Sequence, residues 1–176
     1  MVHFMKRKTN GNGKAAIISE LERLANQSDD ADNWRALVRS VKDAKTKSHV
    51  ELEEAILRAA QAMKNAGVLK GFEAMYFIAG SILIIAEDRT CDKSPALNAV
   101  LDRISEVEKQ HDSEGSEEYE KLSDEFDRLL REIIISTFEE YGETDLAAMY
   151  RYDEEAFHRL YERGRLKFLE RKKITH

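Results

Sequence analysis

Two Glu-x-x-His sequences have the residue types and the spacing of metal ligands. They run from Glu108 to His111 and from Glu155 to His158. Helical bundles that hold two metal ions use two such pairs, together with one glutamate from each of two other helices. Residues three apart lie on one side of a helix, so each pair could ligate a metal ion. The chemistry to test is therefore that of a helical metalloprotein or metalloenzyme.

The angle of each residue around its helix decides whether the pairs could converge. At about 100° per residue, Glu108 and His111 fall within the apolar stripe of the segment that follows Pro95, so this pair is expected to face inward. That stripe comprises Leu97, Val100, Leu101 and Ile104. The second pair is expected to face outward, because His158 lies roughly 90° and Glu155 roughly 150° from the inner face of the last segment. That inner face comprises Phe157, Tyr161, Gly164 and Phe168.

The additional carboxylates that such a site requires are also badly placed. Glu125 and Glu132 lie more than ~100° from the centre of the apolar stripe of their segment, and only Glu140 falls near its inward side. The sequence therefore predicts no bound metal and no cofactor. A metalloprotein that uses Glu108 and His111 is kept as an alternative.

No nucleophile or phosphate-binding loop is convincing. Cys91 lies in a polar segment, 87–93, which is predicted to be a loop. Acidic neighbours there oppose formation of a thiolate while Arg89 and Lys93 favour it, so the reactivity of Cys91 stays open. The sequence around Gly13-Lys14 lacks the glycine spacing and the Ser or Thr of a phosphate loop. We therefore expect a protein that is not an enzyme.

Charge is distributed unevenly along this acidic chain, whose formal net charge is −6. Residues 1–14 hold four basic residues and no acids, and residues 159–173 hold seven basic residues and two acids. In contrast, residues 106–145 hold four basic residues and fifteen acids. Solvated helix faces explain part of this pattern, and a contact with a charged partner is the functional explanation.

Basic residues of the carboxyl-terminal segment are the candidate binding site. Arg159, Arg163 and Lys167 are spaced by four residues and therefore form one ridge on a helix, which Arg171 continues. We expect them to bind an acidic surface of another protein, as an accessory subunit, adaptor or regulator would. Nucleic acid, contacted through the basic N- and C-terminal segments, is the alternative partner, and homo-oligomers stay open.

The elements that carry these residues are expected to be helices throughout. One proline, eight glycines and apolar residues spaced by three and four predict helix after helix, with no strand. Predicted segments begin near Lys14 and Ala31, the second burying Trp34. Ser48 has the spacing of a helix-capping box, and Gly67 and Gly142 are expected to end helices. A last helical region is expected from Thr144 to about Lys172, and Asp153 could cap a new helix within it. The other predicted segments run from 94 to 111 and from 116 to 141.

The stretch 72–87 is apolar around nearly its whole circumference, so it is predicted to be a buried central helix. Its uninterrupted part spans only about 20 Å, against the ~30 Å of a bilayer core, so no membrane span is expected. The predicted fold is all-α: a single compact, bundle-like domain of about seven or eight helices at 14–172. Residues 1–13 are predicted to be a basic tail and 173–176 a short C-terminal one, in a cytoplasmic protein whose lone cysteine cannot form an internal disulfide.

Overall fold

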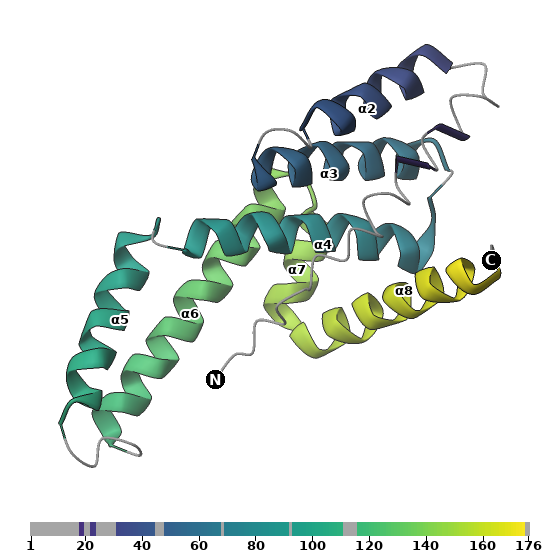
Figure 1. Cartoon of the computed structure of the whole chain (residues 1–176). Helices are drawn as coiled ribbons and strands as arrows, with labels where there is room; N and C mark the ends of the chain where they lie inside the picture. Colours follow the sequence, from purple (N-terminus) through teal and green to yellow (C-terminus); the bar gives the residue numbers. More distant parts are fainter. Residues whose placement is uncertain are drawn as a thin grey trace.

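The structure of the chain, a computed structural model, describes residues 18, 19, 22, 23, 31–44, 48–67, 69–91, 93–110 and 116–174. At 31, 33, 34 and 171–174 only the backbone is described. Across these ranges the chain forms seven helices and no strand, which confirms the predicted all-α fold (Figure 1). The helices are α2 (Ala31–Ala44), α3 (His49–Asn65), α4 (Gly71–Thr90), α5 (Pro95–Glu108), α6 (Glu117–Glu140), α7 (Thr144–Tyr152) and α8 (Glu154–Ile174).

The ends of several helices follow from single residues. Ser48 accepts a hydrogen bond from the Glu51 N–H at 3.2 Å, and the Glu51 carboxylate accepts one from the Ser48 N–H at 3.0 Å, which is the predicted capping box of α3. Gly67 and Gly142 have φ angles of 72° and 78°, which favour glycine and end α3 and α6. The Asp153 side chain accepts a hydrogen bond from the N–H of Ala156 at 3.0 Å, as predicted for the start of α8.

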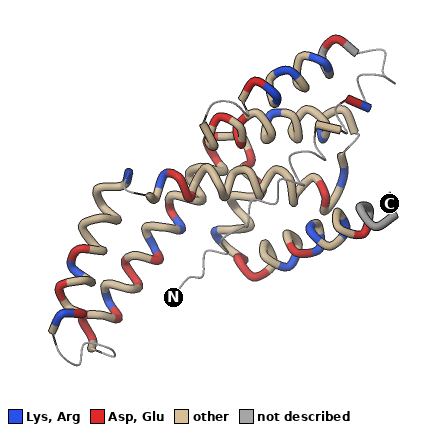
Figure 2. Tube along the Cα trace, in the orientation of Figure 1, with Lys and Arg blue, Asp and Glu red and all other residues tan. Residues whose placement is uncertain are grey.

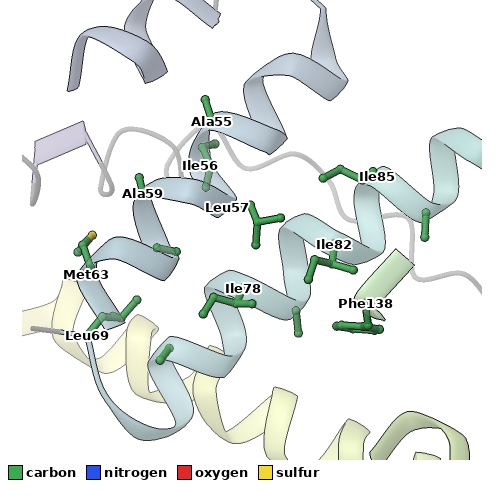
Figure 3. Close-up of a cluster of buried hydrophobic side chains, with 14 of the residues drawn as sticks. Ala55, Ile56, Leu57, Ala59, Met63, Leu69, Ile78, Ile82, Ile85 and Phe138 are labelled. Atoms are coloured by element: carbon green, nitrogen blue, oxygen red, sulfur yellow. The ribbon is translucent and has the colours of Figure 1, made fainter. Parts of the chain in front are cut away.

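Helix α4 lies at the centre of the molecule. It packs against α3 on one side and α8 on the other, and also contacts α6 (Figure 1). Ile78, Ile82 and Ile85 are at most 1 % exposed, and they gather with Leu57 of α3 and Phe138 of α6 in one core (Figure 3). This arrangement confirms the prediction of a central helix.

The burial of α4 is less complete than its composition suggests. Phe72, in its first turn, is 36 % exposed, and Leu83 and Ile84 are only half-buried. The helix also continues to Thr90, so most of the loop predicted at 87–93 is helical. The Thr90 hydroxyl donates to the carbonyl of Glu87 at 2.7 Å, and the N–H of Cys91 donates to the same carbonyl at 3.2 Å. The bond from the Cys91 N–H is the i→i−4 bond of an α-helix, so the helix continues through Thr90 despite the polar side chains.

Helix α3 buries more than the one face that its apolar spacing indicates. Leu57 and Ala60 are fully buried, and the Glu53 side chain is only 3 % exposed, although all three lie outside the apolar spacing of the helix. That spacing is formed by Leu52, Ala55, Ile56, Ala59, Met63 and Ala66. The hydroxyl of Ser81 in α4 donates a hydrogen bond to the Glu53 carboxylate at 3.1 Å. Helix α3 is covered on two sides because it lies between α2 and α4.

Helices α5 and α6 form a hairpin that projects from one end of the molecule (Figure 1). Helix α5 packs on α6, and the hairpin has a small core of its own, made by Val100, Val107 and Leu122. Leu101, which was expected to face this core, is 42 % exposed. That prediction was wrong because, among the described helices, α5 packs mainly on α6, and one helix is too narrow to cover the full width of the apolar stripe.

Some predictions fall outside the described residues. These concern the tail at 1–13, most of the helix predicted from Lys14, the side chain of Trp34, His111 and the residues after Ile174. The division into one domain with two tails therefore stays a prediction. Among the helices that the structure describes, none combines the length and the apolar character needed to cross a bilayer.

Candidate functional site

Aromatic side chains of α8 attach this helix to α4. Phe157 is fully buried, and Phe168 is 9 % exposed. The Phe168 ring meets the Phe77 ring edge-on with 5.1 Å between centroids, and the centroids of the Tyr161 and Tyr76 rings are 5.2 Å apart. The predicted inner face of the last helix is therefore the face that packs, and its opposite side is left for solvent.

Gly164 lies where α8 crosses α4. A Cβ atom at this position would lie 2.1 Å from the carbonyl oxygen of Phe72 and 2.7 Å from the Cβ of Tyr76. The two helices can therefore approach this closely only with a glycine at residue 164. The close crossing fixes the rotation of α8 about its axis, and with it the direction of the basic residues.

The basic ridge, defined here as Arg159, Arg163 and Lys167, projects outward as predicted. All three side chains are exposed, and Figure 2 shows basic positions at intervals along α8. Arg171 lies on the same helix, but its side chain is outside the described residues. A partner that meets this surface would therefore meet at least the three described cations.

The three cations differ in how far they are neutralised. The Arg159 guanidinium donates a hydrogen bond to the Glu155 carboxylate at 2.8 Å, and the Arg163 guanidinium lies 5.6 Å from the centre of the Phe72 ring. Within the described part of the chain, no carboxylate pairs with Arg163 or Lys167. These two cations are thus available to an external anion without first breaking an ion pair.

Arg165 is excluded from the binding surface by its own partner. Its guanidinium donates to the Glu162 carboxylate at 2.9 Å, and this hydrogen bond holds the pKa of Glu162 below its ordinary value. The same bond raises the pKa of Arg165. The Arg165 charge is therefore largely compensated within α8.

Two apolar side chains beside the ridge were not identified from the sequence. Leu166 is 48 % exposed, and Phe72 is 36 % exposed beneath Arg163. Leu166 follows Arg159 by seven residues, so it lies on the same outer side of α8 as the basic ridge. This spacing, visible in the sequence, indicated that Leu166 would be exposed beside the ridge. Phe72 gave no such signal, because its exposure depends on where α8 crosses α4. Aromatic residues and arginine are enriched in protein interfaces, and Phe72 with Arg163 is such a pair.

The predicted metal ligands do not come together. Glu108 is exposed, contrary to its expected inward position, since Val107 takes the inner place on α5. The second pair faces outward as predicted: His158 contacts Glu154 at 3.3 Å, and Glu155 bonds Arg159. Across the described ranges, which omit His111, no three His, Cys, Asp or Glu side chains are grouped as metal ligands would be.

We expect the purified protein to hold no stoichiometric metal. Glu108→Ala and His111→Ala should each leave the metal content unchanged near zero, because Glu155 and His158 face away from the protein. Elemental analysis of protein purified without chelator measures this. Stoichiometric iron, manganese or zinc that disappears in either variant would contradict the prediction.

A polar network lies where α3, α4 and α6 meet. Arg89 donates to Glu140 at 3.1 Å and to the Thr137 hydroxyl at 3.3 Å, and the Tyr141 hydroxyl donates to Glu54 at 2.6 Å. The bond from Arg89 holds the pKa of Glu140 below its ordinary value. Burial and the bond to Glu54 raise the pKa of Tyr141 to about 12. Glu140, expected near the inward side of α6, is instead exposed and joins two helices.

The remaining candidate, Cys91, is exposed directly after α4 as a free thiol. No family model matches this chain, and neither the curated proteins nor the solved structures include a significant match. The site is therefore interpreted from its own geometry alone.

Proposed function

We propose that this chain is a helical, non-catalytic interaction protein, acting as an accessory subunit, adaptor or regulator. The basic ridge on α8 binds an acidic surface of a protein partner. The observation that carries the proposal is the exposure of Arg163 and Lys167 without a paired carboxylate in the described residues, within a chain of net charge −6. The lone Cys91, a free thiol, is compatible with the cytoplasm as the compartment.

The surroundings of the ridge favour a protein partner over a nucleic acid. Leu166 offers apolar contact area that a phosphate backbone does not need, and the aromatic rings of α8 pack against α4 instead of facing outward. The overall negative charge also opposes binding to a polyanion. An acidic protein surface would use the apolar contact area of Leu166 and needs no outward-facing aromatic rings.

Reversing the three charges of the basic ridge tests whether these residues serve partner binding or stability. In the variant Arg159→Glu/Arg163→Glu/Lys167→Glu, we expect the melting temperature to change by no more than a few degrees, because exposed charges each contribute under about 1 kcal/mol. Capture of a partner from cell extract by the immobilised protein should fall strongly. Capture by the unmodified protein should weaken as salt is raised. Calorimetry and identification of the captured protein give the two readouts.

A matched control reverses three basic residues on the other side of α4. Arg35→Glu/Arg39→Glu/Arg58→Glu changes the net charge equally, at exposed positions of α2 and α3. This control should retain capture. If the ridge variant captures every partner as well as the control does, or if nuclease treatment abolishes capture by the unmodified protein, the proposal fails. If the ridge variant unfolds, the three cations stabilise the fold through ion pairs with the acidic segment 106–145, and the proposal fails.

A further inference from the structure

The acidic hairpin of α5 and α6 has the charge and the shape that the ridge on α8 would bind. The hairpin projects beyond the last turn of α4, whereas α8 packs on the first half of α4 (Figures 1 and 2). Eight acidic side chains of its described residues have no cationic partner there. They are Asp102, Glu106, Glu108, Glu118, Glu120, Asp124, Glu125 and Asp127.

The two surfaces also match in their apolar residues. On α5, Leu101 is 42 % exposed, next to Asp102 and on one ridge with Glu108. On α8, Leu166 is 48 % exposed, three residues after Arg163 and directly before Lys167. Each surface therefore has one exposed leucine beside charges of mixed sign: Asp102, Glu106 and Glu108 outnumber Arg103 and Lys109 on α5 and its C-cap, whereas Arg163 and Lys167 flank Leu166 on α8, with Glu162 and Glu170 one turn away on either side.

We propose that the basic ridge of one molecule binds the outer face of α5 in a second copy of this chain. The inference rests on the proposed function, for which it names the partner. Within one molecule α8 meets the hairpin at its first turn, where Arg131 of α6 lies 3.3 Å from Glu154 and the Phe138 ring meets the Phe157 ring. Among the described residues no ion pair joins the basic ridge to α5, so a second copy can supply the acidic partner. Pairing of two different surfaces is a heterologous contact, which leaves one ridge and one hairpin free and allows further copies to add.

The predicted association is weak and sensitive to salt. Each surface offers one leucine and a few charges, which corresponds to the small interfaces of transient complexes. At 0.1 M salt the screening length is about 10 Å, so attraction between exposed charges on the two molecules weakens as salt is raised. Sedimentation velocity of the unmodified chain should show a mass that rises with concentration up to about 300 μM at low salt and falls back in ~0.5 M salt.

Charge exchange provides the decisive test. The ridge variant described above and a hairpin variant, Asp102→Lys/Glu106→Lys/Glu108→Lys, should each weaken self-association by about tenfold or more. An equimolar mixture of the two variants should associate again, because each surface then meets one of opposite sign. The matched control on α2 and α3 should associate as the unmodified chain does. Circular dichroism checks that every variant folds.

The outcomes distinguish this inference from the function on which it rests. If the unmodified chain stays monomeric throughout, the second-copy inference fails, while loss of partner capture by the ridge variant still supports the proposed function. If the mixture does not recover association, the pairing of these two surfaces is wrong. If neither self-association nor capture depends on the ridge, both proposals fail.

Discussion

Gly164→Ala is expected to lower the free energy of unfolding by about 3 kcal/mol, at the upper end of the range for overpacking. The added Cβ would lie 2.1 Å from the carbonyl oxygen of Phe72 and 2.9 Å from its carbonyl carbon. Both atoms belong to the backbone of α4, so no change of rotamer relieves the contact. The helices must separate, which loosens the aromatic packing between them. Thermal and urea unfolding measure the loss, which corresponds to roughly 6–12 °C.

The direction of this effect is informative because alanine is ordinarily the better helix former. In an exposed helix interior, Gly→Ala stabilises by about 1 kcal/mol. Glu170→Ala, at an exposed position of the same helix, is the control and should leave the melting temperature nearly unchanged. Adding Phe72→Ala should not rescue Gly164→Ala, because the contact is with the backbone of Phe72. Rescue, or a stabilised Gly164→Ala, would mean that α8 does not cross α4 this closely.

Ile82→Ala is expected to cost roughly 2–5 kcal/mol through lost burial and a residual cavity. Ile82 is 0 % exposed at the centre of α4, within the same core as Leu57 and Phe138 (Figure 3). A loss of this size lowers the melting temperature by about 4–20 °C, which circular dichroism reports.

The control for this variant is Leu101→Ala. The Leu101 side chain is 42 % exposed on α5, so its truncation should cost under about 1 kcal/mol. If Ile82→Ala melts within a degree or two of the parent, this part of α4 lies on a surface. The apolar stretch would then be an interface.

The helix boundaries set by local chemistry could be read from the sequence. Ser48 with Glu51, Ser94 before Pro95, and Gly142 each lie where the pattern places them. Their effects depend on bonds and backbone angles within a few residues, so no knowledge of distant segments is needed. The inner face of α8 was also predictable, because four apolar or small residues repeat at helical spacing.

Properties that depend on the number of neighbours could not be read in this way. Leu101 and Glu108 share a side of α5 that would be covered if a third helix packed there, and none does among the described elements. Conversely, Glu53 is buried because α4 supplies the Ser81 hydroxyl. The position of Phe72 beneath Arg163 depends on the Gly164 crossing, which joins segments far apart in the chain. For the candidate site, the sequence therefore predicted the cations and not the apolar residues beside them.

The packing of α8 on α4 also bears on how the protein is made. Because α4 precedes α8 in the chain, the ribosome delivers Tyr76 and Phe77 well before the aromatic residues that cover them. During that interval the nascent polypeptide holds an uncovered aromatic surface, the kind that aggregates or recruits chaperones. Helices α3 and α4 can pair as soon as both have emerged, whereas the other side of α4 is completed only when Phe168 arrives. Translation that stops before Phe157 would therefore release a product with this surface permanently open.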